Sequence, residues 1–179
     1  MERVRPAEIR DIPTILELLV QVDMVHHNGR PDLFKGPVTK YTAKELEEIF
    51  AKEDAPVFVC VDESDRVLGH AFTVHKQIVG NNVLTDVRTL YIDDICVDEA
   101  ARGQGVGKEM ICLALKMAFE ILKAEKVTLG VFENNPAAYH CYKAAGFRED
   151  PAKPPAYYPL LGESWKCIDL FIERPENHP

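Results

Sequence analysis

The sequence has no paired cysteines. Its five cysteines are an odd number, are scattered along the chain and form no C-x-x-C pair: Cys60, Cys96, Cys112, Cys141 and Cys167. Disulfide frameworks and zinc sites usually show closely paired cysteines. The sequence therefore predicts reduced, mostly buried cysteines in a cytoplasmic protein, and it predicts no metal site.

Long apolar runs and a basic excess are also missing. No apolar run approaches the roughly 18 residues of a membrane span, and residues 1–6 lack the apolar stretch of a signal peptide. Lys and Arg total 21 against 29 Asp and Glu, which gives a formal net charge of -8. Nucleic-acid binding needs a basic face. We expect neither a nucleic-acid nor a membrane partner, while the acidity is compatible with a cationic ligand.

What is present suits one folded domain. The chain has 179 residues, of which 46% are hydrophobic and 28% charged, as in ordinary globular proteins. No internal repeat or linker interrupts it. We predict a single domain over residues 1–179, with a frayed tail over residues 174–179.

Apolar periodicity predicts the first half of the chain in outline. A short strand around Val4 precedes a helix that is expected to start at Asp11, as its N-cap, and to end near Val25. Thr42 followed by Glu45 forms a capping-box pattern, so a second helix is expected from Thr42 to Lys52. Alternating and β-branched runs predict three strands, at residues 57–61, 67–79 and within 83–97.

The second half alternates helices and strands. A glycine-rich turn leads into an amphipathic helix, and a strand follows at residues 127–132. A short helix from Pro136 to Ala145 is closed by Gly146, which suits a left-handed position. Four prolines between Pro151 and Pro159 predict a loop before a last strand at residues 167–172. The order β-α-α-β-β-β-α-β-α-β predicts an α/β fold, a mixed sheet with helices on both faces.

The glycine-rich turn lies between a strand and a helix. It comprises Arg102, Gly103, Gln104, Gly105, Val106, Gly107 and Lys108. Glycine lets the backbone approach a ligand closely, and successive N–H groups at a helix start bind anions. The turn therefore predicts a ligand that carries phosphate.

Two common phosphate motifs do not fit this turn. The Walker A loop requires glycine where Arg102 stands and Ser or Thr where Glu109 stands. The dinucleotide fingerprint requires glycine where Lys108 stands. The pattern that remains is Arg/Gln-x-x-Gly-x-Gly/Ala, and by itself it is equally typical of a tight strand-to-helix connection.

A second motif about thirty residues downstream decides between these readings. Asn135, Ala138, Tyr142 and Gly146-Phe147 read N-x-x-A-x-x-x-Y-x-x-x-G-F, again after a strand. The two motifs, in this order and at this spacing, resemble those of the GNAT superfamily of N-acetyltransferases. Cys141 stands where that family usually has an aromatic residue, a departure that concerns packing more than chemistry.

The resemblance implies a fold and a cosubstrate. The fold is a central mixed, mostly antiparallel sheet flanked by about four helices and splayed between its fourth and fifth strands. The cosubstrate is acetyl-CoA, with its pyrophosphate on the backbone of residues 102–108 and its pantetheine arm along Ile95, Cys96 and Val97. Asn135 and Ala138 belong to the same binding region. The family also implies a homodimer.

The resemblance further implies three catalytic residues. Tyr142 matches the residue that protonates the departing CoA thiolate. Asp93 and Asp94 match acidic residues that bind or deprotonate the amine in polyamine-type and some aminoglycoside-type members. Strand alternation points neighbouring side chains to opposite faces, so only one of the two is expected to face a given pocket. Asp93 is favoured and Asp94 comes second.

The expected activity is transfer of an acetyl group from acetyl-CoA to a primary amine of a small cationic molecule, by direct attack in a ternary complex. One alternative is acetylation of a protein N-terminus or lysine. Another is a domain that binds acyl-CoA and regulates a partner without turnover. The presence of Tyr142 and the two aspartates favours an enzyme.

Overall fold

The computed structural model describes residues 3–29, 31–32, 34–78, 80–83, 85–160 and 163–175. Within these residues eight strands form one sheet: β1 (Arg3–Pro6), β2 (Val57–Val61), β3 (Val67–Ile78), β4 (Val87–Val97), β5 (Lys126–Phe132), β6 (Arg148–Glu149), β7 (Ala156–Leu160) and β8 (Glu163–Glu173). Their order is β1-β2-β3-β4-β5-β8-β6, and β7 pairs with β8.

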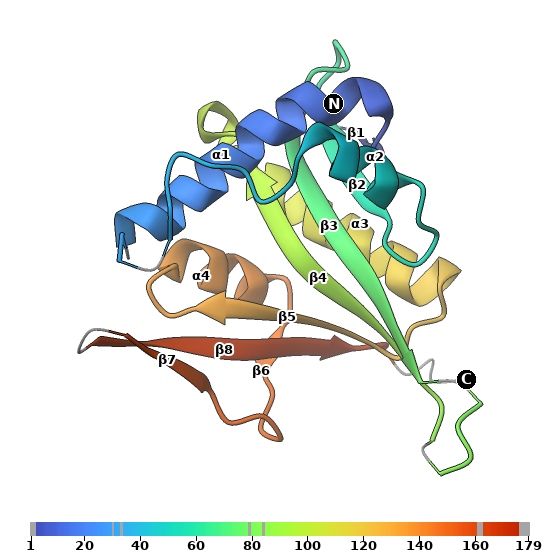
Figure 1. Cartoon of the computed structure of the whole chain (residues 1–179). Helices are drawn as coiled ribbons and strands as arrows, with labels where there is room; N and C mark the ends of the chain where they lie inside the picture. The colour runs from blue at the N-terminus through green and yellow to red at the C-terminus, as the bar shows by residue number, and fades with distance from the viewer. Residues whose placement is uncertain are drawn as a thin grey trace.

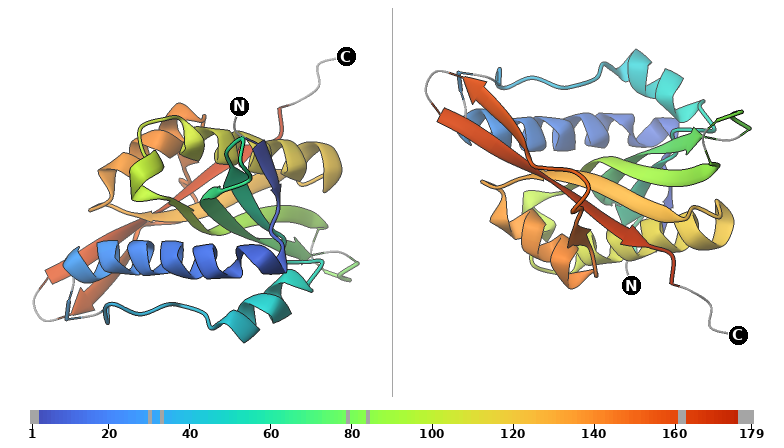
Figure 2. Two further views of the ribbon diagram at one scale, coloured as in Figure 1. Left: turned by 90° about the horizontal axis from the view of Figure 1, so that it is seen from above. Right: turned by 90° about the horizontal axis from the view of Figure 1, so that it is seen from below.

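Helices cover both faces of this sheet (Figures 1 and 2). On one face lie α1 (Ile12–Gly29) and α2 (Ala43–Phe50), and on the other lie α3 (Val106–Lys116) and α4 (Pro136–Ala144). Shorter helical turns are η1 (Ile9–Asp11), η2 (Glu99–Ala101) and η3 (Met117–Ile121), of which η3 continues α3 as a π-helix. The predicted mixed sheet with helices on both faces is confirmed.

The sheet divides between β4 and β5. These strands pair in parallel over Thr89–Ile92 and Lys126–Leu129, whereas every other neighbouring pair is antiparallel. Beyond Ile92, β4 continues to pair with β3 only, and beyond Leu129, β5 pairs with β8 only. The two strands diverge visibly (Figure 1), so the expected splay is confirmed.

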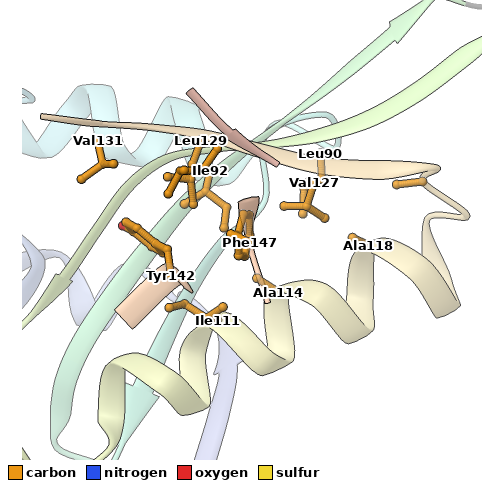
Figure 3. Close-up of a cluster of buried hydrophobic side chains, with 12 residues drawn as sticks. Leu90, Ile92, Ile111, Ala114, Ala118, Val127, Leu129, Val131, Tyr142 and Phe147 are labelled. Carbon is orange, nitrogen blue, oxygen red and sulfur yellow. The ribbon is translucent and has the colours of Figure 1, made fainter. Parts of the chain in front are cut away.

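Each face of the sheet has its own core. Under α3 and α4, Ile111 and Ala114 face Leu129 and Phe147, and Phe147 is 1% exposed (Figure 3). Under α1 and α2 the buried side chains come from both helices and from β2, β3 and β4: Ile12, Ile15, Leu18, Leu19, Leu46, Val57, Val59, Val61, Val67, Phe72 and Cys96. The two cores hold the divided sheet from both sides and so fix the position of the gap.

Two predicted helix termini are confirmed in detail. Thr42 accepts the backbone N–H of Glu45 and the Glu45 carboxylate accepts that of Thr42, which is the expected capping box. Gly146 has φ 97°, and its N–H bonds to the carbonyl of Lys143. The Phe147 N–H bonds to the carbonyl of Tyr142, which completes a Schellman motif at the end of α4.

Two expectations for the first helix are wrong. The helix continues to Gly29 and not merely to Val25, because His26 and His27 still pack against the following segment. Asp11 is not its N-cap. It ends the turn η1, accepts the backbone N–H of Glu8 and forms an ion pair with Arg5 at 2.7 Å.

The proline-rich segment also differs from expectation. Pro159 lies in β7, which pairs with β8 where a loop was predicted. An edge strand tolerates proline because the missing N–H faces no partner. In the tail, the Arg174 side chain donates to the carbonyl of Ala124 at 2.6 and 2.9 Å. Residues 176–179 lie outside the described residues.

Candidate functional site

A bulge in β4 brings the two adjacent aspartates together. Phe72 pairs with Asp94 and Thr73 pairs with Ile92, so Asp93 is an extra residue in β4. The bulge interrupts the alternation of side chains, and both Asp93 and Asp94 line the same cavities. The expectation that only one of them faces a given pocket is therefore wrong.

The glycine-rich turn borders a cavity of about 390 Å³ at the start of α3. Ten residues of the predicted cofactor site line it: Ile95, Val97, Arg102, Gly103, Gly105, Val106, Gly107, Lys108, Ala138 and Tyr142. Sequence reasoning missed three further lining residues, which are Ala101, Ala137 and Cys141.

Three residues of the predicted cofactor site have other surroundings. The Cys96 side chain is buried against α1, with Sγ 3.5 Å from the carbonyl of Leu18. The Gln104 amide donates to the carbonyl of Ala100. Asn135 caps α4 by accepting the N–H of Ala138, and it lines the neighbouring cavity.

The turn has the geometry of an anion site. Gly103 and Gly105 adopt φ values of 78° and 94°, a region that favours glycine. The Arg102 side chain donates to the carbonyl of Val97 at 3.1 Å and so fastens the turn to the end of β4. The first N–H groups of α3 have no partner within the helix, and the Lys108 ammonium adds positive charge. The residues therefore fit a phosphate-bearing ligand.

A second cavity, of about 300 Å³, lies on the α1 side of the gap in the sheet. It shares Ile95, Ala138 and Tyr142 with the glycine-turn cavity. It also shares His26 and both aspartates with a third cavity, of about 520 Å³, under the loop that follows α1. Each cavity thus shares lining residues with the next, and Tyr142 lines both the first and the second. The second and third cavities are together called the acidic cavity, because Asp23, Asp93 and Asp94 line them.

The hydroxyl of Tyr142 points away from Phe147 (Figure 3). The side chain is buried, with 7% of the residue exposed. Burial, and then the nearby Asp94 charge, raise the pKa of Tyr142 above its ordinary value. The phenol therefore stays protonated at neutral pH and can donate a proton.

The acidic cavity distinguishes its two aspartates. The Asp93 side chain is 32% exposed and forms an ion pair with Lys40 at 2.7 Å. The Asp94 side chain is 12% exposed, and burial raises its pKa to about 6. Lys40 lowers that pKa, while Asp93 and Asp23 raise it further. Asp94 is the carboxyl group whose ionisation falls near neutral pH, where a general base is useful.

Residues from α1 and its following loop complete the acidic cavity. Asp23 accepts the backbone N–H of Lys40, and burial raises its pKa. The His26 ring stacks on Phe34 at 5.1 Å and meets Phe132 edge-on at 5.8 Å. Sequence reasoning missed Asp23 and Lys40. An aspartate within the apolar pattern of α1 was the available signal for Asp23, and Lys40 had none.

A family model described as the acetyltransferase (GNAT) family matches residues 23–147. The chain belongs to this family. Within the described part of the chain no helix is long and apolar enough to cross a membrane. The same residues contain no cluster of three or more His, Cys, Asp or Glu side chains placed to hold a metal ion.

Two curated relatives of this GNAT protein have different acceptors in their names. The spermine/spermidine N(1)-acetyltransferase of Bacillus subtilis is 32% identical over 59 residues, which are 33% of this chain and 39% of that relative. The peptidyl-lysine N-acetyltransferase YjaB of Escherichia coli is 30% identical over 126 residues, which are 65% of this chain and 70% of that relative. The chain thus matches about two fifths of the length of the Bacillus relative.

Solved structures share the fold over nearly the whole chain. A point mutant of the BH1408 protein from Bacillus halodurans has a TM-score of 0.77 and 26% identity, covering 89% of this chain and 99% of that one. The spermidine N-acetyltransferase of Vibrio cholerae, in complex with CoA and spermine, has a TM-score of 0.69 and 23% identity. That match covers 96% of this chain and 95% of the Vibrio chain.

Proposed function

We propose that this GNAT protein transfers an acetyl group from acetyl-CoA to a primary amine of a small cationic molecule, by direct attack in a ternary complex. The observation that carries the proposal is the meeting of two cavities at Tyr142. One is bordered by the phosphate-type turn and the other by carboxylates, and they share the gap between β4 and β5. A donor and an acceptor can therefore meet from opposite sides of the sheet.

The glycine-turn cavity suits acetyl-CoA. Its pyrophosphate would lie on the N–H groups of residues 102–108 at the start of α3. Its pantetheine arm would pair with the free backbone edge of β4 at Ile95 and Val97, as an added strand does. One N–H of that edge can then donate to the thioester oxygen, where negative charge develops as the amine attacks.

The acidic cavity suits a cationic amine. Asp23, Asp93 and Asp94 carry three carboxyl groups there against the two ammonium groups of Lys35 and Lys40, and Lys40 is paired with Asp93. The name of the Bacillus relative and the CoA and spermine complex of the Vibrio neighbour support a polyamine-type acceptor. The rings of His26, Phe34 and Phe132 would cover the apolar part of such an acceptor.

Asp94 is the better candidate for the base, although sequence reasoning favoured Asp93. Asp93 is already engaged by Lys40, whereas Asp94 is more deeply buried and has a pKa of about 6. It would accept a proton from the ammonium, directly or through one water, and the neutral amine nitrogen would attack the thioester carbon. As the carbon–sulfur bond breaks, Tyr142 would give its proton to the sulfur, and the second proton that the nitrogen loses on becoming an amide would restore the phenol.

The test is release of thiol from acetyl-CoA in the presence of polyamines, aminoglycosides, amino acids and short lysine peptides. Release with polyamines, and products acetylated on a primary amine, are the expected result. Tyr142→Phe serves as the matched variant, because it keeps the ring and removes the proton. If no amine causes release of thiol while calorimetry shows that acetyl-CoA binds, this proposal is wrong. The alternative, a domain that binds acyl-CoA and regulates a partner without turnover, would then take its place.

A second candidate acceptor is a lysine side chain of a protein. The observation in its favour is the longer match to the peptidyl-lysine acetyltransferase of Escherichia coli. Preferred release of thiol with lysine peptides over polyamines would establish it.

The family also leads us to predict a homodimer and a cytoplasmic location. Light scattering in solution would test the homodimer.

A further inference from the structure

His70 is a buried histidine that the proposed chemistry does not yet use. Its side chain lies on β3, opposite Cys96, and is 0% exposed. Among the described residues neither ring nitrogen has a hydrogen-bond partner. A buried polar group without a partner destabilises the folded state, so its place next to the acidic cavity requires an explanation.

The group that faces this ring is Asp94. Nε2 of His70 lies 4.0 Å from Oδ1 of Asp94. The pairing of β3 with β4 sets this approach, since His70 is opposite Cys96 and Phe72 is opposite Asp94. The edge-on contact of the Phe72 ring at 5.1 Å holds the imidazole in place.

We propose that His70 is a positioning residue for Asp94: its Nε2–H donates a hydrogen bond to Oδ1 of the carboxylate and leaves Oδ2 to face the acceptor amine. The proposal rests on the role of Asp94 as the base. A distance of 4.0 Å exceeds a hydrogen bond, so the two groups must approach by about 1 Å. Hydrogen bonds of this kind are often long before the substrate binds.

The protonation state of His70 suits this role. Burial, and then the charge of Lys40, lower its pKa to about 3, so the ring is neutral at physiological pH. A neutral imidazole carries one N–H. If that N–H is on Nε2, it meets a carboxylate and only the lone pair of Nδ1 is left unpaired. If it is on Nδ1, a buried donor is left unpaired and a lone pair faces a negative charge, which is the less stable arrangement.

The hydrogen bond would act against the other groups around Asp94. Burial, Asp93 on β4 and Asp23 on α1 favour the neutral carboxyl, while Lys40 on the following loop and a hydrogen bond from the backbone N–H of Ile95 favour the ionised one. Tyr142 on α4 also faces this charge. A donor at Oδ1 stabilises the ionised form, so loss of His70 is expected to raise the pKa of Asp94 and to free its rotation.

The test uses NMR on the free protein. Side-chain carboxyl carbons of ¹³C-labelled aspartate are titrated, and the Asp94 signal is assigned with Asp94→Asn. His70→Leu is expected to raise the Asp94 pKa by about half a pH unit or more. In His70→Gln the side-chain amide N–H can replace Nε2–H, so the pKa of Asp94 is expected to return most of the way to the wild-type value. His75→Gln on the same strand is the control, because His75 faces Asp54.

Two further measurements complete the design. Long-range ¹⁵N–¹H spectra of wild-type protein report which ring nitrogen of His70 carries the proton, and Nε2–H is expected even if His70→Leu fails to fold. In the pH profile of kcat/KM, the apparent pKa of the acid limb is expected to be higher in His70→Leu than in the wild type. In His70→Gln it is expected to return towards the wild-type value.

An Nδ1–H ring would overturn the proposal, and so would an Asp94 pKa in His70→Leu equal to that in the His75→Gln control. The NMR measurements require neither acetyl-CoA nor an acceptor. The pairing of His70 with Asp94 can therefore fail while acetyl transfer is observed, and it can hold in a protein that acetylates no amine on the panel.

Discussion

The ammonium of Lys40 lies 2.7 Å from the carboxylate of Asp93, a residue 53 positions further along the chain. The backbone N–H of Lys40 is bound at the same time by Asp23 of α1. Burial is the largest single influence and lowers the pKa of this lysine, but the hydrogen bond to Asp93, the charge of Asp93 and the contact with Tyr41 together outweigh burial and raise the pKa. An internal cation thus stands in the acidic cavity, where a cationic acceptor would bind.

Removal of this internal cation should strengthen the attraction for amines. Lys40→Gln is expected to lower the KM for a diamine by about three- to tenfold, since one unit of opposing charge is lost at a partly exposed site. Lys40→Arg retains the charge and serves as the control. Steady-state kinetics with a diamine and a monoamine would measure the effect, and equal KM values in both variants would contradict it.

Tyr142→Phe is expected to lower kcat by about tenfold or more, because the departing sulfur would lose its proton donor. The ring still packs beside Phe147, so the affinity for acetyl-CoA should change little. Single-turnover kinetics and calorimetry would separate the two quantities. An unchanged kcat at saturating substrates would remove this residue from the chemistry.

The pH dependence of kcat/KM should identify the base. Asp94 accepts a proton only when ionised, and its pKa is about 6. The rate should therefore fall as the pH decreases through about 6. Asp94→Asn is expected to abolish this limb and to lower kcat by about a hundredfold, whereas Asp93→Asn should keep the limb. The reverse pattern would assign the role to Asp93.

The raised pKa of Asp94 also predicts a cost in stability. Its carboxyl ionises near 3.8 in the unfolded chain and near 6 in the fold, so the folded state binds more protons between these values and loses stability as the pH rises through them. The loss is on the order of 3 kcal/mol. Asp94→Asn should remove it, so its melting temperature should exceed that of wild type at about pH 8 but not at about pH 4. An equal rise in melting temperature at both pH values would show that the stability gained in Asp94→Asn is unrelated to the ionisation of Asp94.

Gly146 should matter for both stability and rate. Its φ of 97° disfavours any side chain, and a Cβ there would lie 3.2 Å from Ile172. Gly146→Ala should cost about 1–2 kcal/mol and lower kcat, because the Schellman motif holds the carbonyl of Tyr142. Gly80→Ala is the matched control, with φ 68° and no neighbour within 4 Å. A similar loss of kcat in both would refute the link to Tyr142.

The fold was largely predictable because its signals are local. The capping box at Thr42, the left-handed Gly146 and the periodicity of α3 each depend on a few neighbouring residues. The same holds for the turn around Gly105. Strand β7 escaped prediction because Pro159 reads as a loop residue, and only its partner β8 makes it a strand.

The acidic half of the site was less predictable because it depends on register and on distant segments. The bulge at Asp93 results from the pairing of β3 with β4 and reverses the expected direction of one carboxylate. Lys40 and Asp23 reach the same cavity from a loop and a helix. No spacing rule in the sequence connects them to Asp94, so their contribution follows only from the three-dimensional arrangement.

β4 and β5 are joined by only four residue pairs, at Thr89–Ile92 and Lys126–Leu129. The sheet therefore consists of two halves that meet at a short seam, and amide protons beside the seam should exchange faster than those in the middle of either half. A cosubstrate inserted as an extra strand would close the seam along its open length. The rigidity of this protein would then rise and fall with the supply of acetyl-CoA, and its resistance to proteolysis in the cell would follow the metabolic state.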